Sequence, residues 1–182
     1  MKLEQKNLTN GVIWITGLSG AGKTTLATEV SKKLKQNYQN IILLDGDQLR
    51  EILLLDTFKN DNSLDARYSL SKIYARLCKN LASQNFIVVI STISMFKQIH
   101  VWNRNNIRGY FEVYIKREMK DLISRDTKGI YKNFKLGKIK NVLGLDLKVD
   151  EPKTPDFLVT GPFDNSTSII AEEIIKKFMK RF

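Results

Sequence analysis

The sequence predicts a three-layer α/β/α domain with a mostly parallel sheet of five strands. Three observations lead to this fold class. Short apolar runs alternate along the chain with longer segments in which apolar residues recur every three or four positions. The first apolar run ends in a glycine-rich loop, which a helical segment follows directly. Strands that alternate with helices usually pair in parallel and are covered on both faces, so this order favours an α/β sheet.

The predicted strands are short runs rich in Ile, Val, Leu and aromatic residues, as is usual for buried parallel strands. Helices are predicted where apolar side chains fall on one face, for example Leu26, Val30 and Leu34. In chain order, the predicted elements are strand 12–16, helix 24–35, strand 41–44, helix 70–83, strand 86–90, strand 110–115, helix 119–125, strand 157–159 and helix 166–178.

Two stretches, 55–67 and about 126–154, do not fit this alternation. The second is polar, contains several glycines and has few apolar residues at regular spacing. An irregular segment of this length within a compact domain is usually a functional lid or a disordered region. We therefore expect one domain over residues 1–182, with a mobile lid at about 126–154 that buries little apolar surface of its own.

The overall composition limits the partners that the chain can have. The net charge of +11 suits polyanionic ligands, and it also suits nucleic acid. Because the basic residues are scattered and form no stripe with aromatic residues, no nucleic acid is expected. No segment approaches the ~20 apolar residues of a membrane span, so no membrane is expected either. Cys78 is the only cysteine, which excludes an intrachain disulfide and favours the cytoplasm.

A metal site of the Cys/His type is excluded because the chain has one cysteine and one histidine. We expect that histidine, His100, to be packed or at the surface of a helix rather than to act as a general base. Trp14 lies in the first predicted strand and is expected in the core.

The glycine-rich loop at residues 17–24, Gly-Leu-Ser-Gly-Ala-Gly-Lys-Thr, satisfies the pattern of a phosphate-binding P-loop without a gap. Its glycines allow consecutive backbone N–H groups to converge on phosphate oxygens at the positive end of the next helix. Lys23 is expected to bridge the β- and γ-phosphates of ATP, and Thr24 to bind Mg²⁺. The loop residues predicted to bind ATP are Gly17, Leu18, Ser19, Gly20, Ala21, Gly22, Lys23, Thr24 and Thr25.

Two carboxylates, Asp45 and Asp47, follow the second predicted strand at its carboxyl end, where ligands bind in this class of fold. One of them is expected to orient an acceptor hydroxyl or take its proton, and the other to position water on magnesium. Together with Arg50 they favour a kinase, which a P-loop alone does not specify. Taken alone, the same spacing suits a solvated turn with Asp47 as the N-cap of a helix equally well.

Other P-loop classes are less consistent with the sequence. A GTPase would need an Asn-Lys-x-Asp motif, which is absent. A motor ATPase would need an acidic pair after an apolar strand, but the strand at 86–90 is followed by Ser91 and Thr92. A nucleic-acid 5′-hydroxyl kinase would suit the basic charge, yet no basic groove pattern accompanies it. A P-loop switch and a nucleic-acid kinase are therefore the alternatives outside the class of small-molecule kinases.

Together, these residues resemble the adenylylsulfate kinase family, and the resemblance covers nearly the whole chain. Its marks are Gly-Leu-Ser-Gly-Ala-Gly-Lys-Thr-Thr at 17–25, Leu-Asp-Gly-Asp-x-x-Arg at 44–50 and Ile-Ser-x-Phe at 93–96. The most specific mark is the lid sequence, which starts Arg-Asp-Thr-Lys-Gly-Ile-Tyr-Lys at 125–132 and continues to 146.

The resemblance implies an ATP-dependent kinase that transfers the γ-phosphoryl group to the 3′-hydroxyl of adenylyl sulfate, with ATP and Mg²⁺ as cofactors. It implies that Lys23 and Asp47 are catalytic, that Arg50 and Arg67 hold the anionic tail of the acceptor, and that Arg125 of the lid binds ATP. The acceptor-binding residues so predicted are Asp45, Asp47, Arg50, Phe58, Arg67, Ile93, Ser94, Lys128, Lys140 and Val142. The expected partners are a small-molecule nucleotide and a second copy of the chain.

The departures from the family pattern gather around the acceptor. The pattern Asp-Arg-x-x-Asn-Ile-Arg-Arg aligns with residues 66–73, so that Leu70 replaces an acceptor-binding asparagine and Lys72 replaces an arginine. Lysine cannot make the bidentate fork of an arginine. In the lid, Val142 replaces the phenylalanine that stacks on adenine. Phe58 or Tyr68, from the longer segment before Arg67, would be able to restore that stacking.

A divergent relative of the family, cytidine diphosphoramidate kinase, phosphorylates the 3′-hydroxyl of a cytidine nucleotide that carries a phosphoramidate tail. A pyrimidine needs less stacking surface than adenine, which suits Val142, and a less acidic tail suits a weaker set of cations. We therefore expect a changed acceptor beside an unchanged donor site, and favour the cytidine compound, in phosphoramidate modification of a capsular polysaccharide, over adenylyl sulfate in sulfate assimilation.

Overall fold

The computed structural model describes residues 10–53, 61–161 and 167–182. Five strands form one parallel sheet in the order β2-β3-β1-β4-β5. They are β1 (Gly11–Thr16), β2 (Ile41–Asp45), β3 (Ile87–Ser91), β4 (Tyr110–Ile115) and β5 (Phe157–Val159). The predicted five-stranded sheet is therefore confirmed, and it is parallel throughout in the described part of the chain.

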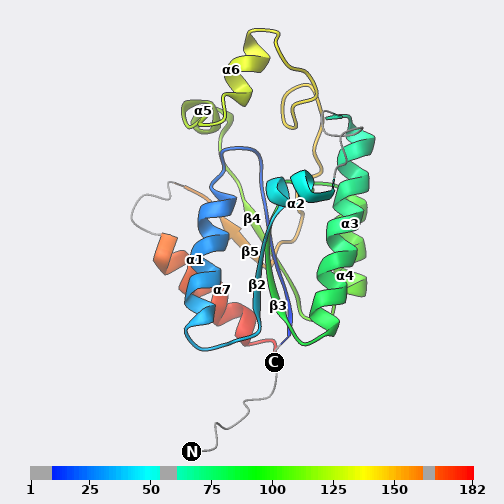
Figure 1. Cartoon of the computed structure of the whole chain (residues 1–182). Coiled ribbons are helices and arrows are strands. Elements are labelled where there is room, and N and C mark those ends of the chain that lie inside the picture. The colour runs from blue at the N-terminus through cyan, green and yellow to red at the C-terminus, as the bar shows by residue number, and fades with distance from the viewer. Residues whose placement is uncertain (1–9, 54–60, 162–166) are drawn as a thin grey trace, which may run out of the picture.

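Helices cover both faces of the sheet, which gives the predicted three layers (Figure 1). One face carries α1 (Lys23–Lys35) and α7 (Thr167–Met179), and the other carries α3 (Leu64–Ser83) and α4 (Lys97–Asn106). Three short helices lie at the carboxyl end of the strands: α2 (Gly46–Leu53), α5 (Met119–Ser124) and α6 (Ile130–Lys135).

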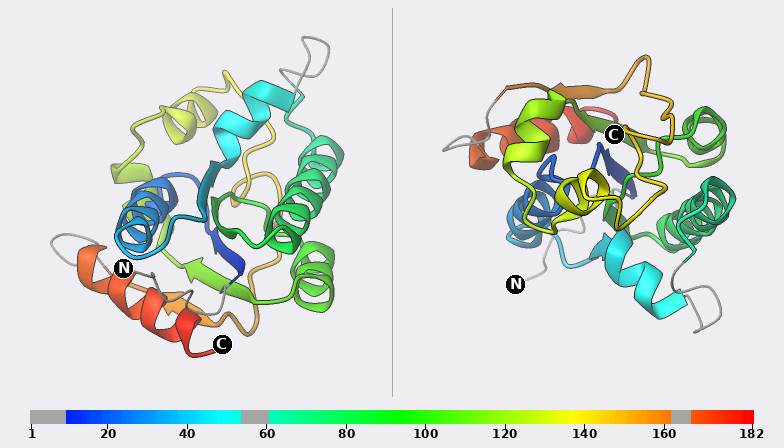
Figure 2. Two further views of the ribbon diagram at one scale, coloured as in Figure 1. Left: turned by 60° about the horizontal axis from the view of Figure 1, so that its bottom comes forward. Right: turned by 90° about the horizontal axis from the view of Figure 1, so that it is seen from above.

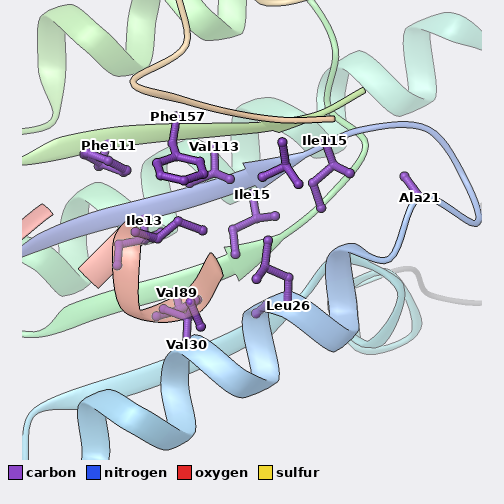
Figure 3. Close-up of a cluster of buried hydrophobic side chains, with 14 of the residues drawn as sticks. Ile13, Ile15, Ala21, Leu26, Val30, Val89, Phe111, Val113, Ile115 and Phe157 are labelled. Carbon is purple, nitrogen blue, oxygen red and sulfur yellow. The ribbon is translucent and has the colours of Figure 1, made fainter. Parts of the chain in front are cut away.

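Alternate residues of the strands supply the two halves of the core. In β1, Ile13 and Ile15 pack with Leu26 and Val30 of α1, as Figure 3 shows, whereas Trp14 joins the cluster beneath α3 and α4. Trp14 is fully buried, which confirms its predicted place in the core. The run of apolar residues in β1 thus reflects a strand that is buried on both faces.

Helix α3 begins at Leu64, six residues before the predicted helix start at Leu70. Its N-cap is Ser63, whose hydroxyl accepts a hydrogen bond from the amide of Ala66 at 3.2 Å. The first amides of a helix have no carbonyl acceptor within the helix, and the Ser63 hydroxyl supplies one of the missing acceptors. Of the stretch 55–67, the structure describes 61–67, and residues 63–67 are the cap and first turn of a helix, while the predicted Phe58 lies outside the described residues.

The lid sequence is less irregular than its composition predicts, and the expectation that it buries little apolar surface is wrong. It contains α6, and its Tyr131, Val142 and Leu143 are 3%, 5% and 6% exposed. Tyr131 and Val142 belong to the same core cluster as α1. Figure 1 shows α6 above the end of α1 that follows the P-loop, and in the view from above (Figure 2, right) the chain after α6 runs across towards α3.

The predicted lid region ends in a segment that is bonded to the sheet. Glu112 of β4 donates its backbone N–H to Asp156 at 2.7 Å, and Arg104 of α4 donates to the carbonyl of Thr154 at 3.2 Å. Lys116 pairs with Glu151 at 2.7 Å. Glu151, Thr154 and Asp156 are thus bonded to β4 and its neighbours, and we propose a shorter lid, about 126–149, than the predicted 126–154. Within the described residues, no helix is long and apolar enough to cross a bilayer.

Candidate active site

A cavity of about 860 Å³ lies at the carboxyl end of the sheet, beneath the lid. It is lined from five places: the P-loop, α2, α3, the loop 92–96 and the lid. The structure thereby brings together most of the predicted site residues, namely Ser19, Gly20, Gly22, Lys23, Thr24, Thr25, Asp45, Asp47, Arg50, Arg67, Ile93, Ser94, Arg125, Lys128, Lys140 and Val142. Gly17, Leu18 and Ala21 complete the P-loop without lining the cavity.

The P-loop forms where β1 ends and α1 begins. Gly22 is the N-cap of α1 with φ 96°, a left-handed conformation that favours glycine. Gly22, Lys23 and Thr24, at the amino end of α1, line the cavity, and a helix amino end favours phosphate oxygens. No side chain caps α1, so the first amides of the helix are available for an anion.

Lys23 is the cation of this loop. Its Nζ donates to the carbonyl oxygen of Leu18 at 2.8 Å. Burial lowers the pKa of Lys23 to about 8, the charge of Asp47 opposes this shift and that of Lys128 adds to it. Burial removes water from the ammonium group, and bound phosphate groups would stabilise its charged form again.

Asp45 lies against the P-loop rather than on the acceptor side. Its Oδ2 accepts hydrogen bonds from Thr24 at 2.8 Å and from Ser91 at 2.7 Å, and its Oδ1 accepts the amide of Asp47 at 2.9 Å. Burial alone would raise the pKa of Asp45, but these bonds outweigh it and lower the pKa. Asp45, not Asp47, therefore caps the start of α2, which answers the alternative that Asp47 is an N-cap.

Thr24, Asp45 and Ser91 form a cluster of oxygen ligands beside the phosphate-binding loop. Mg²⁺ prefers oxygen ligands and is usually held by one or two protein groups together with substrate phosphates and water. Among the described residues, no group of three or more His, Cys, Asp and Glu side chains gathers as a metal site. The cluster fits an ion that arrives with a nucleotide better than a resident metal.

Asp47 points into the cavity from α2 and pairs with Lys128 of the lid. Both side chains are more than half exposed, at 68% and 58%. An exposed ion pair contributes little to stability, so a ligand can displace it easily. Asp47 is thus accessible to an acceptor that enters the cavity.

Arg50 and Arg67 lie together next to residues 61–62. Arg50 donates to the carbonyl of Asp61 at 2.6 Å, and Arg67 donates to the carbonyl of Asn62 at 3.0 Å and to that of Asn141 at 3.2 Å. Burial, followed by the neighbouring charge of Arg50, lowers the pKa of Arg67. Two cations held this close favour an anion between them.

The acceptor side of the cavity contains polar residues that the sequence did not point out. The hydroxyl of Ser71 lies 2.8 Å from that of Ser94, which lies 2.8 Å from that of Thr92. Ser71 and Thr92 were missed, as was Asn62, which lines the same side. A signal for Ser71 existed: it is a polar residue at a position where the family pattern has isoleucine, directly after Leu70.

The aliphatic substitutions lie in the same cavity. Leu70 and Val142 both line it and are 6% and 5% exposed. Tyr68 does not restore a lost stacking ring, because its ring packs edge-on against Phe96 with centroids 5.3 Å apart. Phe96 itself lines the cavity, and is an aromatic side chain that the sequence had not assigned to a base.

The lid contacts the P-loop directly. Tyr131 of α6 donates its hydroxyl to the carbonyl of Ser19 at 2.9 Å. Gly144 lies so close to Leu18 that an added Cβ would come within 2.8 Å of its side chain. The structure therefore has the lid over the cavity.

Comparison with known proteins agrees with this arrangement. Residues 9–160 match the profile of the family described as Adenylylsulphate kinase. The chain is 39% identical to cytidine diphosphoramidate kinase of Campylobacter jejuni subsp. jejuni serotype O:2, over 91% of this chain and 95% of that protein. It is 36% identical to a probable adenylyl-sulfate kinase of Pyrococcus abyssi, over 81% of this chain and 83% of that protein.

Among solved structures, the chain is similar to the APS kinase of Mycobacterium tuberculosis in complex with AMPPNP and APS. The TM-score is 0.82 at 29% identity, and the match covers 93% of this chain and 98% of that chain. The prediction of a kinase that transfers phosphate to a hydroxyl is thereby confirmed. The chain belongs to the adenylylsulphate kinase family.

Proposed function

We propose that this protein transfers the γ-phosphoryl group of ATP to the 3′-hydroxyl of a cytidine 5′-diphosphate anhydride with a phosphoramidate tail. One observation carries the choice of acceptor. Leu70 stands where the family has an acceptor-binding asparagine, and Val142 where it has the phenylalanine that stacks on adenine. Both side chains are aliphatic and buried, and both line the cavity. The 39% identity to a cytidine diphosphoramidate kinase supports the same choice.

The donor side supports ATP. The P-loop keeps every residue of its motif, and Lys23 and Thr24 both line the cavity. The structural relative was solved with an ATP analogue. In the proposed complex, the amides of the loop bind the β- and γ-phosphates, and Lys23 exchanges its contact with Leu18 for phosphate oxygens.

Thr24 and Asp45 would hold Mg²⁺ at this point. When bound, the ion neutralises charge on the phosphates as they react. This role fits the oxygen cluster that Thr24, Asp45 and Ser91 form.

Asp47 is the proposed base for the acceptor. The acceptor displaces Lys128 from Asp47, and the carboxylate then orients the 3′-hydroxyl and accepts its proton. The hydroxyl oxygen forms a bond to the γ-phosphorus while the bond to the β-phosphate oxygen breaks and ADP leaves. Lys128 is then free to contact the transferred group.

The acceptor side supports a small, polar base. Phe96 offers one aromatic surface, whereas Val142 stands at the position of the family's stacking phenylalanine. Asn62 and the hydroxyls of Ser71 and Ser94 offer hydrogen-bond partners nearby. Cytosine has less surface for stacking than adenine, and base–aromatic stacking contributes about 1–3 kcal/mol, so the lost phenylalanine is less costly for a pyrimidine.

The test compares kcat/KM for two acceptors, cytidine diphosphoramidate and adenylyl sulfate, with ATP as donor and the product identified by phosphorus NMR. Adenylyl sulfate is expected to be the poorer acceptor by ~100-fold or more, because a stacking contact, a hydrogen bond and an arginine fork are all missing. A tenfold preference for adenylyl sulfate would instead identify an adenylyl-sulfate kinase with an altered pocket. ATP turnover that needs no acceptor would indicate a P-loop switch.

A matched pair of variants sharpens the comparison. The double variant Leu70→Asn with Val142→Phe restores the family residues and is expected to shift the preference towards adenylyl sulfate by about tenfold. Lys72→Arg alone should change this preference less, because Lys72 lies over the ring of Tyr68, 4.7 Å from its centroid.

The proposal also includes a cytoplasmic location, which suits a chain with a single, buried cysteine. It further includes self-association as a homodimer.

A further inference from the structure

The loop 92–96, between β3 and α4, forms the floor of the acceptor side of the cavity. Within it, Ser94 has φ +21°, on the side of backbone space that residues other than glycine rarely adopt. Such a residue costs free energy and persists only when surrounding contacts fix it. The contacts that hold this loop therefore determine the shape of the acceptor site.

Asp150 holds the loop from the side of the lid. Its amide donates to the carbonyl of Met95 at 2.9 Å, and its Oδ2 accepts the amide of Lys97 at 2.9 Å. Lys97 is the first residue of α4, and the N-cap residue Phe96 makes no side-chain cap. Asp150 thus serves as the cap that α4 lacks and connects both ends of the turn that leads from the loop into the helix.

His100 fixes Asp150 to the sheet. Its Nε2 lies 3.2 Å from the carbonyl oxygen of Asp150, and its Nδ1 lies 2.7 Å from Oε1 of Glu112. Glu112 is 2% exposed and belongs to β4, and His100 is 9% exposed. Burial alone would raise the pKa of Glu112, but the contact with His100, together with Tyr110 and Arg104, lowers it, so Glu112 is an anionic anchor.

We propose that His100 is a positioning residue of the acceptor site. It lies outside the cavity lining and acts through Asp150 on the loop 92–96. The proposal rests on the proposed function in one respect, that this loop binds the acceptor and not ATP. Since Asp150 also ends the lid, the same contacts set the point from which the lid moves.

Two substitutions of His100 separate its two contacts. Asparagine places an amide nitrogen near the position of Nδ1, so His100→Asn keeps the bond to Glu112 and loses the bond to Asp150. Glutamine reaches about as far as Nε2, so His100→Gln keeps the bond to Asp150. A residue that only stabilises the fold would depend on its bond to the buried Glu112, whereas a positioning residue depends on its bond to Asp150.

We expect His100→Asn to raise the KM for the acceptor about tenfold, and His100→Gln to raise it less than about threefold. The KM for ATP should stay within about twofold in both variants, because the hydrogen bonds of His100 and Asp150 go to Glu112 and to residues 95–97 and not to the P-loop. The acceptor used is whichever of cytidine diphosphoramidate and adenylyl sulfate the wild-type enzyme phosphorylates faster. Equal effects of the two variants, or a parallel rise in the KM for ATP, would overturn the proposal.

Arg104→Gln is the matched control. Arg104 lies on the same helix and bonds the same Glu112 at 3.1 Å, but it donates its other hydrogen bonds to Asp156 and Thr154. It should lower the melting temperature without changing the KM for the acceptor by more than about twofold. A rise equal to that of His100→Asn would mean that loss of the network as a whole causes the effect, and it would contradict the proposal.

A second measurement does not depend on the acceptor. Hydrogen exchange at the amides of Lys97 and Asp150 should quicken in His100→Asn and stay close to wild type in Arg104→Gln. Asp150→Ala should have the same effect on Lys97, while Asp150→Asn, which still offers a side-chain oxygen, should restore its protection. Asp150 is exposed, so this pair tests the contacts of Asp150 with Met95 and Lys97 even if the His100 variants fail to fold. Unchanged exchange in the folded variants would overturn it, whether or not the proposed acceptor is correct.

Discussion

The donor and acceptor sides of the cavity are built in different ways. The donor side is one continuous stretch, residues 17–25, fixed by the turn from β1 into α1. The acceptor side is assembled from α2, the start of α3, the loop 92–96 and the lid, which are far apart in the sequence and meet through side-chain contacts such as Arg67 with Asn141. A single continuous motif tolerates few changes, whereas each wall of an assembled pocket can change by itself. This difference explains how an intact donor loop can stand beside a changed acceptor site.

The sharpest test of the donor side is Lys23→Ala. The fold should stay intact, but phosphoryl transfer should fall by about 10³-fold or more, because the charge that develops on the transferred phosphates loses its nearest cation. Steady-state kinetics with either acceptor measures the loss. Lys35→Ala, an exposed lysine in the last turn of the same helix, is the control and should retain full activity. A Lys23→Ala enzyme with more than a tenth of wild-type activity would contradict the assignment of the P-loop.

On the acceptor side, Asp47→Asn should lower kcat about 100-fold and change the KM for the acceptor much less. An amide is similar in size but accepts no proton, and the contribution of a base is made mainly in the transition state. Asp45→Asn is the paired comparison, since Asp45 bonds Thr24 and its loss should raise the magnesium requirement instead. A change confined to the KM for the acceptor would make Asp47 a binding residue without a role in catalysis.

The difference between a continuous donor loop and an assembled acceptor side also determines which site residues the sequence could predict. Lys23 and Thr24 were predictable because backbone geometry dictates the P-loop pattern, and Asp47 because it follows a strand end. The bond between Thr24 and Asp45 joins residues that are 21 positions apart, so local spacing left open which of Asp45 and Asp47 serves the magnesium side. His100 was expected to be packed or at the surface of a helix, and its partner Asp150 is 50 positions away.

Local signals were also missed where a tertiary contact decides the outcome. Ser63 is a residue type that caps helices, but the weak apolar spacing before Leu70 does not predict the helix that begins there. In the lid, Tyr131 and Val142 do not belong to any regular spacing of apolar residues. They are buried because the lid packs on the P-loop and α1, a surface that exists only in the folded chain. Sequence spacing reports the face of an element, but not which element covers it.

The donor side should respond to pH through Lys23. Burial lowers its pKa to about 8 in the free enzyme, and bound phosphates should raise it again. Binding of ATP above pH 8 must then take up a proton, so the affinity should fall as the pH rises above 8, by up to about tenfold per pH unit. Below pH 8 the lysine is already charged and the affinity should be flat.

Titration of the enzyme with ATP between pH 7 and 9 measures this effect, and AMP is the control because it lacks the phosphates that Lys23 contacts.

The pH dependence of the free energy of unfolding tests the direction of the same pKa shift. The unfolded chain holds this proton up to a pKa of about 10.4, so it binds more protons than the folded chain between pH 8 and that value. Lys23 should therefore contribute stability that rises with pH in that window. An affinity for ATP that does not change up to pH 9 would contradict the lowered pKa.

The smallest expected effect lies where the two sides meet, at the hydrogen bond from Tyr131 of the lid to the carbonyl of Ser19 in the P-loop. Burial raises the pKa of Tyr131 to about 12, so its hydroxyl stays a donor at neutral pH. Tyr131→Phe removes this bond and leaves the ring in place, which should cost about 1 kcal/mol and raise the KM for ATP a few-fold.

Hydrogen exchange should locate that loss in the lid. Without ligands, amides between 127 and 146 should exchange faster in Tyr131→Phe than in the wild type, and the difference should shrink when ATP and the acceptor are both bound, because the lid cations then pair with anions. Tyr38→Phe removes the same atom from a partly buried tyrosine that does not line the cavity, and it should leave the lid unchanged. If exchange in the lid is equal in Tyr131→Phe and the wild type, then packing against Leu18 and α1, rather than this bond, holds the lid on the donor side.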